Sequence, residues 1–525
     1  MRKDSPAGIQ EWSGRDSPER DENSKITRNG IHSLIRKNTP YVLFERAVGA
    51  TVSFLTTVFI IRSLSIEAFG IYSVLLSVML YVGLFSSLGL PSLFQRFIPE
   101  FFQKNEIGKL KQLVGKGLLW RFLACASLII ILLGFSAPLG RLFRIAGALE
   151  YLKLFALAII FYLETQLQGT VLTSIFRHRW YAIAQVSYIV LRAGILFVLI
   201  GLGFGLQGLL VGEALAYSFL FLVQRTFYRR FLASCPTDAG VELPFRRLLK
   251  FGGFTFLNET GAQVLSDSTD VFVIAAVLGP AAVGTYAFAT RVMTLATHIL
   301  PQFAFINVIR PAFFTMHVQD DAPGQINARF NFLVKLIALF SVPLILAIFI
   351  LGDKMIIHIF DRKYLGSLTV LWIVAGFTAF NFFFEPIGLV LQSIEKVEIL
   401  FYSKIFAVYN LATSILWVEP YGIVGVAVST GTAVLFKNLF CYFLAKKHVR
   451  LRIDFRGIGI IIVNGLTMAG ILMLTRPWAK SLAAFISISL LGLGVYIAMG
   501  SVNRAFSKAE RDFINRILPK PVFIF

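Results

Sequence analysis

The most constraining feature of this chain is an internal repeat that is superimposed on long apolar runs. Four residues of the first half recur 214 positions later: Glu45, Gly70, Tyr72 and Arg96 correspond to Glu259, Gly284, Tyr286 and Arg310. Further on, Phe204-Gly205 and Gly208 recur as Tyr421-Gly422 and Gly425 with an offset of 217. A repeat of this size between runs of membrane-spanning length is typical of transporters built from two similar helix bundles.

The composition of the chain is that of a polytopic membrane protein. Of its 525 residues, 56% are hydrophobic and 15% are charged, whereas soluble domains carry about 25% charged residues. The three cysteines and six histidines match no metal or redox spacing, so we expect neither a metal site nor a cofactor. The net charge of +21 is concentrated at alternate ends of the apolar runs. This pattern follows membrane topology and predicts no nucleic-acid partner.

Apolar runs long enough for transmembrane helices follow one another along most of the chain. About 20 residues are needed to cross roughly 30 Å of hydrocarbon. We predict about fourteen spans, at 41–62, 69–90, 115–138, 153–174, 181–201, 207–227, 250–277, 281–303, 328–351, 366–391, 398–417, 421–445, 457–475 and 481–500. Basic residues cluster at 104–111, 229–230, 246–250 and 446–452. By the positive-inside rule, both termini are then cytoplasmic in a protein of the inner (plasma) membrane.

The spans predict an all-α integral membrane protein made of two lobes. Residues 41–230 form the first six-helix lobe in this reading, and residues 245–446 form the second. Six is an even number, so both repeats enter the membrane from the same face and run parallel, related by an axis along the membrane normal. Residues 457–500 add two transmembrane helices outside the repeat.

The two ends of the chain are predicted to lie outside the membrane core. Residues 1–40 are polar and lack the apolar region of a signal peptide, so we expect a disordered cytoplasmic tail with a short interfacial helix near 31–37. Residues 501–525 contain an apolar face with charges opposite, formed by Phe506, Phe513, Ile514 and Ile517. This pattern predicts an interfacial amphipathic tail helix.

Three motifs point to a known family. Asp270 precedes an apolar helix, a Gly turn and the helix start Gly284-x-Tyr286; its first-half counterpart ends in Gly70-Ile-Tyr72, and Tyr-Gly-Ile-Val-Gly-Val-Ala at 421–427 opens a later helix. Together they resemble the polysaccharide repeat-unit flippases (Wzx type) of the MOP superfamily, over roughly residues 40–500. That superfamily also holds the lipid II flippases and the MATE drug exporters. The motifs are helix-start and packing features, so they say more about the superfamily than about the substrate.

The resemblance implies a function and its partners. Two six-helix lobes would surround a central cavity, with the first and seventh spans facing it. Alternating access would carry a polyprenyl-diphosphate-linked oligosaccharide from the cytoplasmic to the outer leaflet, for export of cell-surface polysaccharide such as O-antigen or capsule. The partners are then this lipid-linked glycan, membrane lipid, a coupling cation or proton, and polysaccharide polymerase machinery.

Acidic and amide residues form two stripes inside the spans. Glu259, Gln263, Asp267 and Asp270 fall at helical spacing on one face, and only Glu45 repeats in the first half. Polar groups in a span must face protein or water, so the stripe is either a cavity-facing proton, cation or sugar site or a buried seam between helices; a misassigned interfacial segment is the third alternative. In the second stripe, Glu164 and Gln168 match Asn381 and Glu385. The following Pro386 predicts a kink, which suits a moving helix and static packing alike.

Six basic residues are candidates for binding an anionic headgroup. Arg192, Arg291 and Lys404 lie within spans, and Arg46, Arg96 and Arg310 lie near cytoplasmic ends. The guanidinium fork matches phosphate oxygens, which favours a diphosphate ligand. The alternatives are pairing with buried carboxylates for Arg192 and Arg291, snorkelling for Lys404, and topological anchoring for Arg96 and Arg310. We expect Arg291 to rest against Asp267 or Asp270 when no ligand is bound.

Other function classes lack their sequence features. There is no Gly-x-x-x-x-Gly-Lys-Ser/Thr loop and no soluble domain large enough to hydrolyse ATP, so we expect a transporter driven by an ion gradient, the membrane potential or the substrate gradient, and not an enzyme. The main alternative is a MATE-like ion-coupled antiporter of drugs or small solutes, which needs a less cationic pocket. A membrane glycosyltransferase or polymerase is disfavoured, because the outer loops near 139–152 and 352–365 are short and their Asp353 and Asp361 form no recognisable pair.

Overall fold

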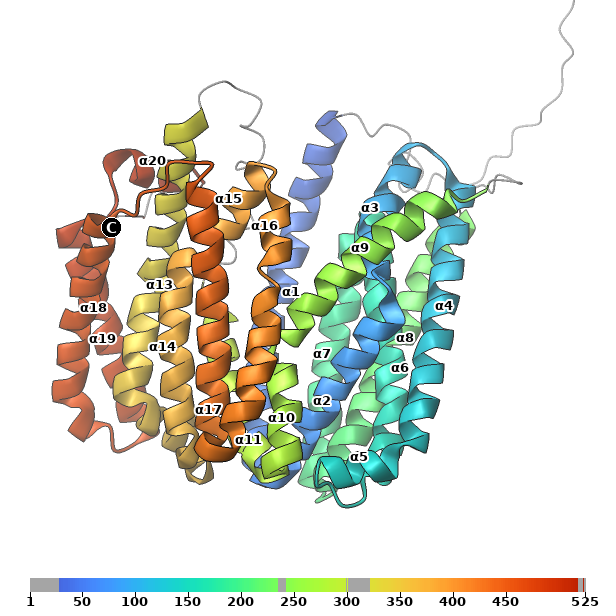
Figure 1. Cartoon of the computed structure of the whole chain (residues 1–525), viewed down its shortest axis with the longest axis horizontal. Coiled ribbons are helices and arrows are strands. Elements are labelled where there is room, and N and C mark those ends of the chain that lie inside the picture. The colour runs from blue at the N-terminus through green and yellow to red at the C-terminus, as the bar shows by residue number, and fades with distance from the viewer. Residues whose placement is uncertain (1–27, 235–241, 299, 301–321, 518–522, 524–525) are drawn as a thin grey trace, which may run out of the picture.

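The structure is a computed structural model that describes residues 28–234, 242–298, 300, 322–517 and 523. The described part is helical and contains no strand (Figure 1). Arg310 and residues 1–27 of the predicted tail lie outside the described residues. Helix α1 begins at Arg28, so it includes residues 28–40 of the predicted tail, where we expected only a short interfacial helix near 31–37.

The helices follow one another with short connections. The first half contains α1 (Arg28–Ser63), α2 (Ile66–Ser87), α3 (Leu90–Gln103), α4 (Ile107–Gly134), α5 (Ser136–Leu142), α6 (Ala148–Ser174), α7 (His178–Gly201) and α8 (Gly205–Ser234). The second half contains α9 (Phe245–Val264), α10 (Asp267–Leu278), α11 (Pro280–His298), α13 (Ala322–Ile359), η3 (Arg362–Ser367), α14 (Leu368–Phe384), α15 (Ile387–Ser393), α16 (Val397–Tyr402) and α17 (Ile405–Lys446). The chain then continues through α18 (Phe455–Thr475), η4 (Arg476–Trp478), α19 (Leu482–Asn503) and α20 (Lys508–Ile517).

Most helices are long and apolar enough to cross a membrane. Within the described residues, ten pass this test, or eleven when the bent pair α9–α10 counts as one span. That count takes 397–446 as one element, although the backbone of Gly422 in α17 is not helical (φ 62°) and hydrogen bonds such as Ser414–Ser429 (3.0 Å) show that the two parts of α17 fold back on each other. The predicted number of fourteen spans stays a prediction.

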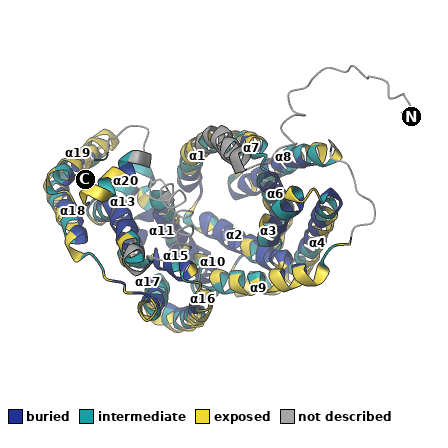
Figure 2. Ribbon diagram, turned by 90° about the horizontal axis from the view of Figure 1, so that it is seen from above, coloured by how far each residue is buried: buried dark blue, intermediate teal, exposed yellow. Residues whose placement is uncertain are grey.

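Helices pack mainly on others of the same half of the chain. In the first half, α6 packs against α4 and α8, and α7 packs against α1 and α8. In the second half, α14 packs against α11, α13 and α17. Figures 1 and 2 show the two groups side by side, with α2, α10 and α11 between them. The predicted lobe boundaries at 41–230 and 245–446 stay a prediction.

The seventh predicted span is not one straight helix. Helices α9 and α10 are bent by 51° relative to each other. Ser266 causes the break, because its backbone is extended and its hydroxyl donates a hydrogen bond to the carbonyl of Gln263 (2.6 Å). The stripe expected on a single helix face is therefore divided, with Glu259 and Gln263 on α9 and Asp267 and Asp270 on α10. At Pro386, in contrast, the expected interruption is present, since α14 ends at Phe384 and α15 begins at Ile387.

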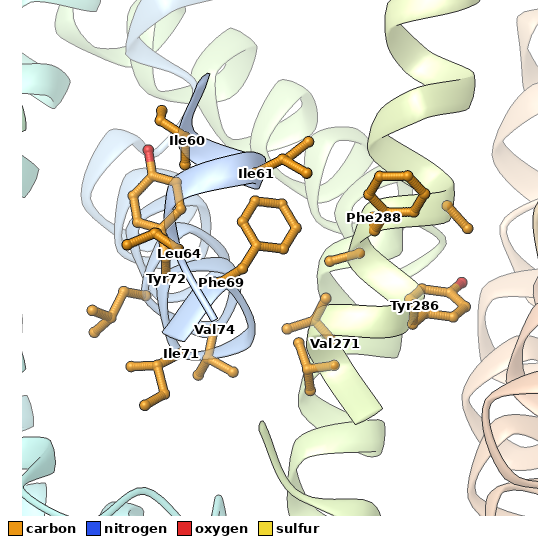
Figure 3. Packing of buried hydrophobic residues seen from close by; sticks show 14 of the residues in the cluster. Ile60, Ile61, Leu64, Phe69, Ile71, Tyr72, Val74, Val271, Tyr286 and Phe288 are labelled. Atoms are coloured by element: carbon orange, nitrogen blue, oxygen red, sulfur yellow. The ribbon is translucent and has the colours of Figure 1, made fainter. Parts of the chain in front are cut away.

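The two halves meet where α2 crosses α11. A Cβ added to Gly70 would lie 1.8 Å from the carbonyl oxygen of Pro280, and a Cβ added to Gly284 would lie 2.0 Å from that of Ile66. The contact is reciprocal, since Pro280 and Gly284 lie 214 positions after Ile66 and Gly70. Only glycine allows backbones this close. Around the crossing, Phe69 of α2 and Phe288 of α11 face each other across the gap (Figure 3).

The ends of the bundle that are lower in Figure 1 are tied together across the two halves. Arg62 at the end of α1 donates to the carbonyl oxygens of Phe360 (2.6 Å) and His358 (2.8 Å). In return, the ammonium of Lys363 in η3 donates to the carbonyl oxygens of Arg62 (2.9 Å) and Leu64 (2.8 Å). The ring of Phe288 in α11 stacks on that of Tyr364 in η3 (centroids 4.4 Å apart). The structure is therefore closed at this end.

At the upper end, the two halves meet through α3 and α9. Arg247 of α9 forms a two-pronged pair with Glu100 of α3 (3.0 and 3.1 Å). Hydrogen bonds from Arg247 and Lys104 lower the pKa of Glu100, which lies outside the apolar spans, to about 2. Glu100 is therefore an anion at any physiological pH, and the pair persists.

The C-terminal helices pack onto α13. Helices α18 and α19 contact α13 and each other. The buried ammonium of Lys335 in α13 pairs with Glu510 of α20 (2.8 Å) and Asp454 (3.1 Å). Ile514 of α20 is 1% exposed, and the ring of Phe513 contacts Phe332 of α13 (centroids 5.6 Å). Part of the apolar face that we predicted to lie in the membrane interface therefore packs against protein.

The glycine crossing yields a prediction about stability. Gly284→Ala forces a methyl group into the backbone of α2 and should lower the free energy of unfolding by about 1–3 kcal/mol or more, as overpacking does. The measurement is thermal unfolding of the purified protein in detergent. Gly194→Ala on α7 is the matched control, because nothing lies within 4 Å of its added Cβ. An alanine at 284 that unfolds at the wild-type temperature would contradict the close crossing.

Candidate functional site

A polar cavity of about 160 Å³ lies between the two halves. Its walls come from α1, α2, α7, α10 and α11, which surround the centre of the bundle in Figure 2. Three of the predicted site residues line it together: Arg192 from α7, Asp267 from α10 and Arg291 from α11. Arg192 lies 75 positions before Asp267 and 99 before Arg291 in the chain, so the fold brings it to them.

Arg192 is fixed by a buried carboxylate. Its Nε donates to Oε2 of Glu213 on α8 (2.9 Å), and its Nη2 pairs with Oε1 of the same carboxylate. The hydroxyl of Tyr72 on α2 donates a further hydrogen bond to Glu213 (2.8 Å). The side chain of Glu213 is 1% exposed, and that of Arg192 is 17% exposed. Pairing with a buried acid, one of the two alternatives for Arg192, is therefore present, and Arg192 also lines the cavity.

Arg291 lies in the same cavity without such an anchor. No ion pair or hydrogen bond joins it to another side chain in the described part of the protein, and the residue is exposed to the cavity. Asp267 shares the cavity but does not pair with it, and Asp270 is engaged elsewhere. The expected resting contact between Arg291 and these acids is thus absent from the described residues. All donors of the guanidinium fork remain available to a ligand.

Asp270 is the centre of a buried network on the other side of α11. It is fully buried and accepts hydrogen bonds from Tyr286 (2.6 Å), Thr430 (2.7 Å) and Asn410 (3.4 Å). Ser414 and Ser429 extend the network from Asn410. All of these partners are neutral. The carboxylate therefore has oxygen-rich hydrogen-bond partners without a positive charge, and a second acid, Asp267, lies one turn away on α10. Such surroundings suit a bound proton or a small hard cation.

The two networks occupy corresponding places in the repeat. Tyr72 and Tyr286 are repeat partners, and each donates to a buried acid. Their hydroxyls point to opposite sides of the α2–α11 crossing (Figure 3). Glu213 and Thr430 are separated by 217 positions, the offset of the later part of the repeat. In the first half, the charge of Glu213 is neutralised by Arg192. In the second half, no described cation pairs with Asp270.

Glu259 and Gln263 line a neighbouring cavity of about 390 Å³. Ser92 of α3 donates to Glu259 (2.9 Å), and Gln263 donates to Ser266 (3.1 Å). The opposite wall carries Arg121 of α4, which is 1% exposed and whose Nε and Nη1 have no hydrogen-bond partner in the described structure. A buried guanidinium with two nitrogens lacking partners among the described residues is an unusual feature for an apolar span.

The remaining candidates lie outside the central cavity. Glu164 of α6 is buried near Arg121, and one of its oxygens has no partner in the described residues. Lys404 packs its stem on Gly261 of α9, as a snorkelling lysine does. Five candidates remain, and the structure places four of them: Glu45 and Arg46 beside each other on α1, Arg96 exposed on α3, and Glu385 exposed at the α14–α15 break. The fifth, Arg310, lies outside the described residues.

Sequence reasoning missed Glu213 and Arg121. Both are ionisable residues in the middle of apolar runs, at 207–227 and 115–138, so the cost of a charge in lipid already singled them out. Their roles were not readable, because the partners lie on other helices. No group of three His, Cys, Asp or Glu side chains that could hold a metal occurs in the described chain.

Comparison with known proteins agrees with this fold and extends it. A family model described as "Polysaccharide biosynthesis protein" matches residues 59–369. A curated protein of Haloferax volcanii, described as the probable low-salt glycan biosynthesis flippase Agl15, is 23% identical over 86% of this chain and 91% of its own length.

Solved structures show the same fold. The lipid II flippase MurJ in an inward closed conformation matches with a TM-score of 0.69 and 16% identity, over 91% of this chain and 99% of its own. An inward-facing multidrug MATE transporter of the MOP superfamily matches with a TM-score of 0.59 and 15% identity, over 76% and 94%. The chain therefore has the MOP fold and is a multi-pass membrane protein.

The buried pair of Arg192 and Glu213 yields a prediction about stability. Glu213→Leu leaves the charge of Arg192 buried and unpaired, so it should cost about 3–5 kcal/mol of stability and lower the amount of protein in the membrane. The double variant Arg192→Met/Glu213→Leu removes both charges and should recover most of the abundance. Membrane abundance and the unfolding temperature are the measurements. Equal losses in the single and the double variant would show that the pairing is not what stabilises this site.

Proposed function

Because the chain belongs to the polysaccharide biosynthesis protein family, we propose that it is a flippase for lipid-diphosphate-linked oligosaccharides. It moves polyprenyl-diphosphate-linked repeat units from the cytoplasmic to the outer leaflet by alternating access, for export of cell-surface polysaccharide. The observation that carries this proposal is the central cavity, in which Arg291 offers an unpaired guanidinium beside Arg192. The relationship to Agl15 supports it, whereas the likeness to MurJ and MATE structures concerns the fold.

The two arginines have different roles in binding a diphosphate. Arg192 is held in place by Glu213, so its position is set before the ligand arrives. Arg291 has no such tie and can form two parallel hydrogen bonds to phosphate oxygens. An antiporter of drugs would leave a free cation in this cavity without a partner. The cationic cavity therefore favours the flippase over the MATE-like alternative.

The charge distribution supports an orientation. Basic residues at the upper end in Figure 1 include Lys104, Arg247 and Lys446, each at or near a helix end. By the positive-inside rule we place this end, and with it both termini, in the cytoplasm and the protein in the inner (plasma) membrane. The cross-links of Arg62 and Lys363 then close the outer side, which supports access from the cytoplasm. Polysaccharide polymerase machinery would receive the product on the outer side.

Asp270 is proposed to couple transport to a proton or a cation. Its partners Tyr286, Asn410 and Thr430 are neutral and come from α11 and both parts of α17. Neutralising Asp270 therefore changes how tightly these helices are held together. A charge that crosses 100 mV contributes about 2.3 kcal/mol, enough to bias two conformations without ATP.

The first test of the function addresses Arg291. Arg291→Ala should abolish glycan export at normal membrane abundance, and Arg291→Lys, which keeps the charge but loses the fork, should reduce export partly. The measurement is surface glycan in cells that lack their own flippase, with abundance determined alongside. Arg96→Ala is the matched control, because Arg96 is exposed on α3 away from the cavity. Full export by the alanine variant at 291 would remove this residue from the mechanism.

The second test addresses coupling. Asp270→Asn keeps the size and most hydrogen bonds of the side chain but fixes its charge at zero. In proteoliposomes, wild-type translocation should respond to an imposed proton or sodium gradient, and that of the variant should not. Glu164→Gln serves as a control, since it neutralises a buried acid of the first half. An undiminished response of the Asp270→Asn variant would rule out this site as the coupling group.

A further inference from the structure

A cavity of about 620 Å³ in the first half has walls of a different chemistry from the central one. It lies between α3, α6, α7 and α8, and none of its described lining residues is charged. Aromatic, amide and hydroxyl side chains dominate instead, among them Tyr162, Gln166, Tyr181, Gln185 and Tyr217. Its volume is in the range of ligand pockets, about 300–1,000 Å³.

The walls are built from side chains at helical spacing. On α6, Tyr162, Gln166, Thr170 and Thr173 follow at i, i+4, i+8 and i+11. On α7, Tyr181, Gln185 and Tyr188 follow at i, i+4 and i+7. Both stripes face the same space. Gly169 keeps α6 open at this level, because a Cβ there would lie 3.0 Å from the ring of Tyr181.

The side chains are held in defined positions. The ring of Tyr188 stacks on Tyr217 (centroids 5.3 Å, planes 22° apart), and Tyr162 meets Tyr217 edge-on (5.1 Å). Gln166 donates to the hydroxyl of Tyr162 (2.6 Å). The hydroxyls of Thr170 and Thr173 donate to backbone carbonyls of α6, which leaves their oxygens as acceptors.

This chemistry matches a neutral carbohydrate. Sugar rings present apolar C–H faces, which pack on aromatic rings, and hydroxyls, which pair with amides and hydroxyl oxygens. The described lining offers a diphosphate no cation, and a lipid tail would leave the amides unpaired. Uncharged polar walls with rigid rings therefore select the glycan part of the substrate.

The cavity lies next to the cationic site. Tyr188 and Tyr217 each lie one helical turn from a member of the Arg192–Glu213 pair, on α7 and α8 respectively. Tyr188 and Tyr217 thus border both the neutral cavity and the Arg192–Glu213 pair. Because the first sugar is covalently bonded to the diphosphate, a diphosphate bound at the arginines would place this sugar close to them.

We propose that this cavity is the binding site for the first sugars of the lipid-linked oligosaccharide, and that it contributes glycan affinity independent of the diphosphate. The inference rests on the proposed function, because it takes the substrate class from it. The phosphate end lies at Arg192 and Arg291, and the glycan extends along α7 toward Tyr181.

The test compares two ligands on one protein. The full-length protein in lipid nanodiscs is titrated with polyprenyl diphosphate, and with the same lipid carrying neutral di- and trisaccharides of hexoses and N-acetylhexosamines. Tyr181→Ala and Gln185→Ala should each weaken binding of a sugar-bearing lipid about tenfold, the effect of one or two lost hydrogen bonds. Binding of the bare lipid should not change. Val190→Ala, an exposed position on α7 outside the cavity, should change neither.

The outcomes separate the two proposals. Wild-type protein that binds bare and sugar-bearing lipids equally well, across the panel, overturns the glycan site and leaves the flippase proposal standing. Parallel loss of both ligands in both cavity variants also overturns it, since the residues would then be structural. Wild-type protein that binds no polyprenyl diphosphate of either kind overturns the proposed function and the inference with it.

Discussion

The contact of two glycines at the crossing of α2 and α11 determines what the centre of this protein can be. Gly70 and Gly284 bring the backbones together, so no side chain separates the two halves at this point. Two residues further along each helix, Tyr72 and Tyr286 turn roughly to the opposite face, away from the crossing. Each tyrosine then donates to a buried acid in its own half. One close contact therefore fixes the positions of both polar networks.

The two networks solve the problem of a buried acid in different ways. The negative charge of Glu213 is neutralised by Arg192, so replacing both residues by apolar ones leaves the net local charge unchanged. Asp270 has neutral hydrogen-bond partners and a second acid, Asp267, nearby among the described residues, so its charge depends on what binds to it. The first arrangement is fixed and suits a ligand-positioning role. The second responds to protons or cations and suits a role in driving the conformational change.

Much of this arrangement was predictable from sequence, and the failures have physical causes. The repeated Gly-x-Tyr motif was recognisable in the sequence. In the structure, its glycines form the α2–α11 crossing and its tyrosines bind the two buried acids. The stripe from Glu259 to Asp270 was predicted on one helix, because periodicity does not show that the hydroxyl of Ser266 interrupts the backbone. Arg192 was found, but its partner Glu213 was not, since a pair on neighbouring helices has no sequence spacing. The neutral cavity was likewise hidden, because its walls come from four helices.

The two halves therefore share the positions of the glycines and tyrosines at the crossing but differ in the polar groups around them. The first half carries the anchored arginine and the uncharged cavity, whose groups suit the ligand, and the second half carries the acid with a variable charge. Tyr286 connects that acid to α11, the helix that also bears Gly284 and Arg291. A change of charge at Asp270 thus acts on the helix that touches α2 and holds the free arginine. In the proposed cycle, ion binding and diphosphate binding are linked through this one helix, without any contact between the ion and the substrate.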